Sequence, residues 1–76
     1  MIRIAHTADD VIGAVDEARR DSGVTLLELR ELSGVSASTV SGWTTGARAP
    51  RLPELLRVLE ALGLEVVIQH RPRAKK

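Results

Sequence analysis

Hydroxyl side chains crowd one short stretch near the middle of this 76-residue chain. They are Ser36, Ser38, Thr39, Ser41, Thr44 and Thr45, and the arginines Arg48 and Arg51 follow them. A hydroxyl donates one hydrogen bond and accepts others, while a guanidinium pairs with two acceptors at once. Between residues 36 and 53 these two arginines are the only charged residues. The stretch is suited to contacting a polar, anionic surface.

The two histidines point to no second chemistry. His6 and His70 could share a metal ion only if the chain termini meet, and no third ligand type is evident beside them. Neither histidine has a serine nucleophile with an obvious orienting acid, so hydrolysis is not supported. The chain contains no cysteine, which excludes disulfides and thiolate metal sites. We expect no catalytic residue, no cofactor and no metal.

The length and charge of the chain bound its class. Seventy-six residues suffice for one domain, 1–76, near the lower size limit for independent folding. The net charge of +1 is unevenly distributed, since acidic residues gather in the first segment and the tail, 71–76, carries four basic residues and no acid. No apolar run is long enough to span a membrane, and the N-terminus lacks a signal-peptide pattern. We expect a soluble, cytoplasmic protein without a membrane partner.

Capping signals divide the first half of the chain into two helices. Thr7 and Asp10 predict a start for a helix over about 8–22. Thr25 and Glu28 form a capping box, which predicts the start of a second, short helix over about 26–33. Leu26 and Leu27 both fall in its first turn, where one of them should be exposed.

Two further helices are expected in the second half. Gly34 ends the second helix, and Ser36 caps a third over about 37–45, so that the two cross steeply after a very short link. Its apolar pair, Val40 and Trp43, has the spacing of core residues. Pro53 then opens a leucine-rich helix that runs to about Leu62.

Near both termini the apolar residues change from helical spacing to alternation with polar residues. Ile2 and Ile4 alternate around an arginine, and residues 64–70 alternate in the same way, which predicts short strands. A strand needs partners for its backbone, so we expect pairing between these segments or with a second copy of the chain. The residues assigned to dimerisation are Leu64, Val66, Val67 and Ile68.

The Gly34-Val35-Ser36 turn, the buried pair after it, and Gly46 and Pro50 before a leucine-rich helix resemble the Cro/C1-type helix-turn-helix family. The similarity covers roughly residues 11–63. The ending ALGLEVVIQHRPR resembles that of small antitoxins of the HipB kind. The resemblance implies a mainly α, four-to-five-helix, lambda-repressor-like domain, with the helix-turn-helix at 25–45. Its short terminal β-strands, 64–70 above all, would pair in a homodimer.

The resemblance also implies double-stranded DNA as the ligand, with the helix at 36–45 in the major groove. Short side chains there make single rather than bidentate contacts, and Gly42 is expected to let the helix approach DNA closely. Arg48 and Arg51, with no acid nearby, are assigned to phosphate. The DNA-binding residues implied are Thr25, Ser36, Ala37, Ser38, Thr39, Ser41, Gly42, Thr44, Thr45, Arg48 and Arg51.

Three positions depart from the family pattern. Leu26 stands where relatives have a glutamine, and Arg30 stands where they keep alanine, so its stem must bend outward or the crossing must open. Arg19 lacks the acidic partner that some relatives place at Thr44, so it must bind Glu17, Asp16 or a backbone carbonyl.

The expected function is a homodimeric repressor that binds a near-palindromic operator and is not an enzyme. The main alternative is an antitoxin, which binds a toxin protein and regulates its own operon. A helical scaffold without DNA binding, or a motif kept only for dimerisation, would also fit the small side chains of the third helix.

Overall fold

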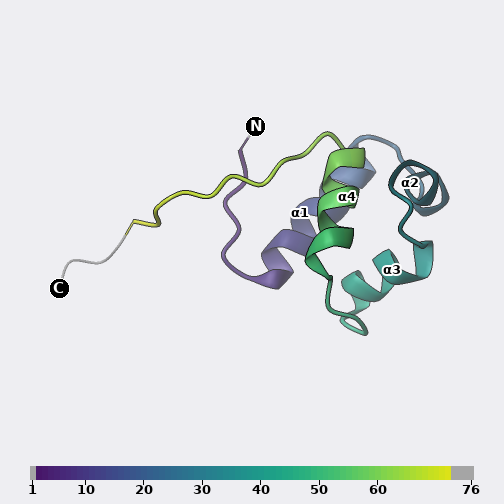
Figure 1. Ribbon diagram of the computed structural model, residues 1–76, viewed down its shortest axis with the longest axis horizontal. Helices are drawn as coiled ribbons and strands as arrows, with labels where there is room; N and C mark the ends of the chain where they lie inside the picture. The colour runs from purple at the N-terminus through teal and green to yellow at the C-terminus, as the bar shows by residue number, and fades with distance from the viewer. Residues whose placement is uncertain (1, 73–76) are drawn as a thin grey trace.

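The computed structural model describes residues 2–72 and contains four helices within them (Figure 1). Their bounds are α1 Ala8–Asp21, α2 Leu26–Ser33, α3 Ala37–Thr45 and α4 Leu52–Ala61. The mainly α fold is confirmed, and α2 and α3 have the predicted bounds. Helix α4 begins one residue before Pro53 and ends one before Leu62, which caps it. Helix α2 contacts both α3 and α4, and α1 contacts α3.

Both predicted helix starts are present, and a capping box forms at each, including the one predicted for α2. Thr7 Oγ1 accepts a hydrogen bond from the backbone N–H of Asp10 at 3.0 Å, and a carboxylate oxygen of Asp10 accepts one from the backbone N–H of Thr7 at 3.2 Å. In α2, Thr25 Oγ1 accepts from the N–H of Glu28 at 3.1 Å, and Glu28 accepts from the N–H of Thr25 at 3.0 Å. Each box satisfies two backbone donors that a helix start otherwise leaves unpaired.

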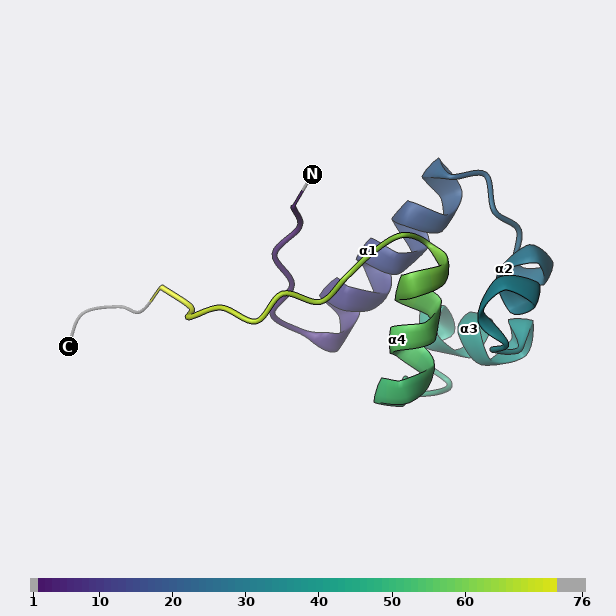
Figure 2. The ribbon, with the colours of Figure 1, turned by 45° about the horizontal axis from the view of Figure 1, so that its top comes forward.

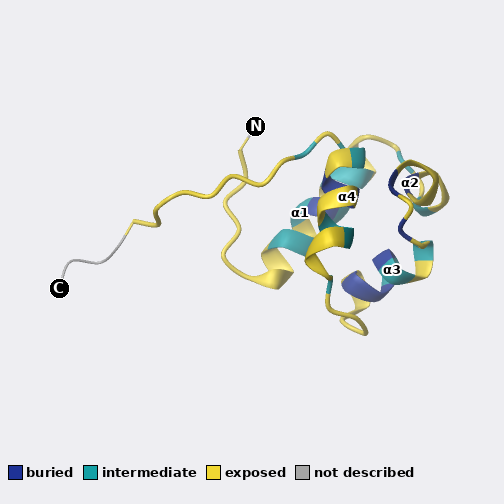
Figure 3. Ribbon diagram, viewed as in Figure 1, coloured by how far each residue is buried: buried dark blue, intermediate teal, exposed yellow. Residues whose placement is uncertain are grey.

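One apolar core joins all four helices (Figure 3). Leu29 of α2 and Val58 of α4 are fully buried at its centre. Leu26 packs partly buried against this core, while Leu27 is 57% exposed, so one of the two adjacent leucines is exposed, as predicted. The other buried apolar residues are Val15, Val35, Val40, Trp43 and Leu59.

The link between α2 and α3 is fixed by one serine that the sequence did not single out. The buried Ser33 hydroxyl donates to the carbonyl of Leu29 at 2.6 Å and accepts the N–H of Val35 at 3.1 Å. Gly34 between them adopts a left-handed conformation with φ of 76°, which favours glycine. Together these contacts set the angle at which α3 leaves α2.

Both terminal segments lie outside the helical body (Figures 1 and 2). No strand occurs within residues 2–72 of this single chain. The predicted pairing between the two terminal segments is therefore absent. A lone extended segment has no ladder partner, and pairing with a second copy stays a prediction. Arg3 forms an ion pair with Glu17 of α1, which ties the N-terminal segment to the body.

Three further features concern metal ligands, membrane-spanning helices and the basic tail. No cluster of three metal-ligating side chains occurs in the described part of the chain, where His6 and His70 are both exposed. No helix among residues 2–72 is long and apolar enough to cross a membrane. The basic tail lies mostly outside the described residues, which include Arg71 but not Arg73, Lys75 or Lys76.

Candidate nucleic-acid interface

Helix α3 has an apolar inner face and a hydroxyl-bearing outer face. Val40 and Trp43 are buried, as predicted, and pack in the core. Ser38 and Thr45 are exposed on the other side, and Thr44, which is also exposed, lines an open groove with Asp9 and Asp16 of α1. The helix carries no charged residue in its first or last turn, so its free backbone N–H groups and hydroxyls dominate the surface near its start.

Three hydroxyls are linked at the N-terminus of α3. Ser36 caps the helix, since its Oγ accepts the backbone N–H of Thr39 at 3.2 Å. The same oxygen lies 2.7 Å from Thr39 Oγ1 and 3.3 Å from Ser38 Oγ. This network holds Ser36 and Thr39 in fixed orientations and leaves Ser38 at its exposed edge. Of the three, Ser38 is best placed to meet a ligand.

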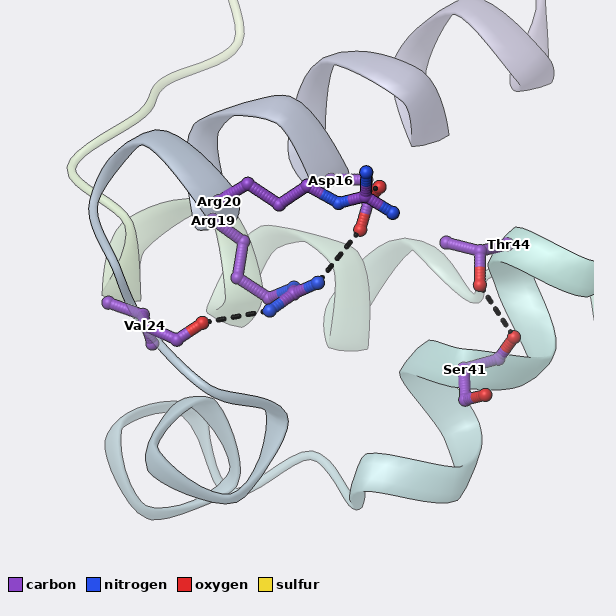
Figure 4. Close-up of polar contacts among 6 residues, drawn as sticks. All are labelled: Asp16, Arg19, Arg20, Val24, Ser41 and Thr44. Atoms are coloured by element: carbon purple, nitrogen blue, oxygen red, sulfur yellow. Dashed lines mark hydrogen bonds and ion pairs between the residues drawn. The ribbon is translucent and has the colours of Figure 1, made fainter.

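The two threonines at the end of α3 donate their hydroxyl protons to their own helix. Thr44 Oγ1 donates to the carbonyl of Ser41 at 2.9 Å (Figure 4), and Thr45 Oγ1 donates to the carbonyl of Gly42 at 3.3 Å. Thr44 Oγ1 then keeps its lone pairs for a donor, whereas Thr45 Oγ1 already accepts the backbone N–H of Ala47 at 3.5 Å. Phosphate offers only acceptors, whereas adenine and cytosine expose amino donors in the major groove. In this arrangement Thr44 suits a base edge better than a phosphate.

An open groove lies beside the start of α3. Thr39 lines it together with Arg48, Ala49 and Arg51 of the following loop and Glu54 of α4. The expectation that no acid lies near the arginines is wrong, because Glu54 shares this groove. Even so, within residues 2–72 neither Arg48 nor Arg51 forms an ion pair. Both are exposed, and their positive charge borders the hydroxyl face.

Gly42 was expected to let α3 approach DNA closely, but it is not exposed. It is buried, because the aliphatic part of Arg48 covers it: a β-carbon at position 42 would lie 2.9 Å from both Cγ and Cδ of Arg48. The sequence carried a hint of this contact, a glycine in mid-helix where alanine would be more stable, six residues before an arginine. The spacing alone did not reveal that the two residues touch.

The remaining assigned residues differ in exposure. Thr25 is exposed at the N-terminus of α2 and Ala37 is half-buried in the first turn of α3. Ser41 is partly exposed. Arg30 is exposed, so its stem bends outward, the first of the two arrangements expected.

Arg19 is held away from α3 (Figure 4). Its guanidinium donates to the backbone carbonyl of Val24 at 2.9 Å and to Asp16 at 3.2 Å, which are two of the three partners expected. The third, Glu17, pairs with Arg3 instead. Asp16 also pairs with Arg20 at 3.0 Å. This network fixes the end of α1 against the segment that leads into α2, in place of the pairing that some relatives make with α3.

A short helix, a left-handed turn and a second helix with a polar outer face define a helix-turn-helix domain of the DNA-binding class. A helix-turn-helix family model matches residues 15–68. The chain belongs to this family, the Cro/C1-type helix-turn-helix family of DNA-binding regulators. No curated protein matches the sequence.

Solved structures with the same fold include HipB. A HipB variant in complex with an O2 20-mer is 18% identical, with a TM-score of 0.85, covering 95% of this chain and 100% of that one. HipB in a HipA–HipB–O2–O3 complex is also 18% identical, with a TM-score of 0.84, covering 93% and 100%. At this identity the likeness establishes the fold.

Proposed function

We propose that this protein is a sequence-specific repressor that inserts α3 into the major groove of double-stranded DNA. The observation that carries the proposal is the surface of α3, where Ser38, Thr44 and Thr45 are exposed, followed in the chain by Arg48 and Arg51, which form no ion pair within residues 2–72. Hydroxyls make single contacts to base edges, and the arginines neutralise phosphates. Direct reading is therefore modest, and DNA shape contributes to selection.

The repressor acts as a homodimer joined through residues 64–70. Val66, Val67 and Ile68 are exposed in the single chain, and Ile68 retains 94% of its accessible surface. Pairing of this segment with its copy gives the backbone its partners and buries apolar side chains. Two-fold symmetry then presents two copies of α3 to successive major grooves, about 34 Å apart on a near-palindromic operator.

The proposal is tested by fluorescence anisotropy with the duplex that lies just upstream of this protein's gene. A scrambled duplex of equal length serves as the competitor, and both are titrated at two salt concentrations. We expect a preference for the upstream duplex that persists at the higher salt. The double substitution Ser38→Ala with Thr39→Ala removes this preference, while Ser22→Ala, at the far end of α1, leaves it unchanged.

Two results would overturn the repressor. Equal binding to both duplexes that disappears at higher salt would indicate only a basic surface. No binding to either duplex would remove DNA as the ligand. Thermal unfolding of the double variant, monitored by circular dichroism, must match the wild type, because Thr39 also contacts the Ser36 cap.

A second candidate function is that of an antitoxin, which binds a toxin protein as well as its own operator. The observation that favours it is the surface of α2, where Leu27 and Leu32 are exposed. The related fold of HipB occurs in a complex with HipA. Co-expression with the product of the adjacent reading frame tests this candidate. Co-purification that is lost in Leu27→Ser with Leu32→Ser, at unchanged thermal stability, would support a protein partner on α2.

A further inference from the structure

The outer face of α3 includes a residue from outside the helix. Ser38, Ser41, Gly42 and Thr45 have the i, i+3, i+4, i+7 spacing of one helical face, yet Gly42 is buried. Arg48 covers it, and a β-carbon at position 42 would lie 2.9 Å from Cγ and Cδ and 3.2 Å from Cβ of this arginine. The arginine stem thus occupies the space that a side chain at position 42 would take.

The backbone fixes this arginine from the other side. The N–H of Arg48 donates to the carbonyl of Gly42 at 3.0 Å, which folds the loop back onto the helix. Gly46, with φ of 82°, supplies the left-handed turn that makes the return. Two contacts, one through the backbone and one through the stem, therefore place Arg48 beside the hydroxyls of α3.

The guanidinium of Arg48 is available for a ligand. Within residues 2–72 it forms no hydrogen bond and no ion pair, and its side chain lines the groove that also contains Thr39. Helix α3 itself has no side chain that can make a bidentate contact. Arginine is the residue that pairs two donors with the two acceptors of a guanine edge or of a phosphate.

We infer that Gly42 is a positioning residue, which holds Arg48 on the reading face of α3 so that this arginine supplies the bidentate DNA contact the helix lacks. The inference rests on the proposed DNA binding and deepens it by naming the residue that discriminates. The ligand group is a pair of adjacent acceptors, on guanine or on a phosphate.

A different role for Gly42 makes a different prediction. If the glycine serves only to bring the helix backbone close to DNA, a β-carbon there weakens binding whatever residue occupies position 48. If it serves to seat Arg48, the β-carbon matters only while the arginine is present. A double-mutant cycle separates the two roles.

The cycle uses Gly42→Ala, Arg48→Met and the double variant, with anisotropy on the upstream and scrambled duplexes. Arg48→Met keeps an apolar stem over the glycine and removes the guanidinium. We expect each single variant to weaken binding to the upstream duplex by at least about fivefold, the lower limit for a lost bidentate contact. The double variant binds no more weakly than Arg48→Met.

Thermal stability distinguishes the positioning of Arg48 from a purely structural role of Gly42, because only a structural role would lower the unfolding temperature of Gly42→Ala. The three nearest atoms to the new β-carbon, beyond the local backbone, belong to the exposed Arg48 side chain. Rotation about the side-chain torsions of Arg48 moves its Cγ and Cδ away, and alanine favours the helix more than glycine does. Gly42→Ala is therefore expected to unfold at the same temperature as the wild type or higher, while it binds DNA more weakly.

Each outcome decides the inference. Additive losses in the cycle, unchanged binding by Gly42→Ala, or unfolding of Gly42→Ala would each overturn it. Absence of any preference in the wild type would instead refute the proposed function itself. Single-base replacements in the upstream duplex identify the acceptors, because a guanine contact makes the Arg48→Met loss specific to one position. A phosphate contact makes that loss uniform and reduces the salt dependence.

Discussion

The helical body, residues 7–63, and the C-terminal segment, residues 64–72, both contain apolar side chains, but the body forms the core and the segment adds to it only Leu64, which was assigned to dimerisation. In the body, Leu29 and Val58 are fully buried and the starts of α1 and α2 are closed by their own side chains. In the segment, Val66, Val67 and Ile68 are exposed and the backbone has no ladder. The body therefore buries its core within one copy, whereas these three side chains of the segment would be buried only by a partner, as in the proposed homodimer.

The functional face follows the same division. The hydroxyls of α3 and the seat of Arg48 are built from contacts within the body, so one copy can form a reading surface. In the proposed homodimer, the spacing between two such surfaces would depend on residues 64–70. Affinity for a half-site would then be a property of the body, and recognition of a palindrome a property of the pair.

The largest effect is expected from a leucine that the body buries. Leu29→Ala should lower the free energy of unfolding by about 2–5 kcal/mol, because it removes a fully buried side chain and leaves a cavity. Leu27→Ala, two residues away in the same helix, should change it by no more than about 0.5 kcal/mol. Urea denaturation followed by circular dichroism measures both. Equal losses would mean that a second chain covers Leu27.

The next effect concerns the segment. Val66→Asp should raise the dissociation constant of the dimer by at least about tenfold, since burial of a valine contributes about 1.5–3 kcal/mol. Gln69→Asp places the same charge in the same segment at a residue that is already polar, and it should have a much smaller effect. Sedimentation equilibrium gives the constants, and the far-ultraviolet circular dichroism should be unchanged in both. A wild-type protein that stays monomeric would contradict the assignment of residues 64–70.

The helices could be predicted from the sequence because their signals are local. A threonine followed three residues later by an acid starts α1 and α2, and Gly34 and Gly46 end α2 and α3 in left-handed turns. Such signals depend only on backbone geometry over one turn. The strands could not be settled in this way, because a ladder depends on where a second strand lies.

The exposure of the hydroxyls on α3 could be predicted from the sequence, but the contacts around them could not. The hydroxyls of α3 lie at its outer face because helical periodicity fixes which side of a helix meets the core. The cover over Gly42 depends on the conformation of a long arginine side chain, which residue spacing does not encode. The same holds for Arg19, which had three candidate partners in the sequence and binds two of them in the fold.

The smallest effect tests how far the body depends on its own caps. The backbone N–H of Thr25 bonds to the Glu28 carboxylate and lowers its pKa, and the N–H of His6 does most to lower the pKa of Asp10. The folded state therefore binds fewer protons than the unfolded state in the acid range. This stabilisation is complete above the unfolded pKa values and is lost as the pH falls through the lowered folded ones, so stability should decline below about pH 5.

Glu28→Gln isolates the contribution of one box to this decline. At pH 6 the variant should be less stable than the wild type in urea, because the amide is a weaker acceptor than the carboxylate. As the pH falls through the lowered pKa of Glu28 and the wild-type carboxyl becomes protonated, the two midpoints should converge. Glu31→Gln removes the same charge from the same helix outside the box and should retain the wild-type decline. Parallel pH profiles for wild type and Glu28→Gln would show that the start of α2 is held by packing of the body rather than by its capping box.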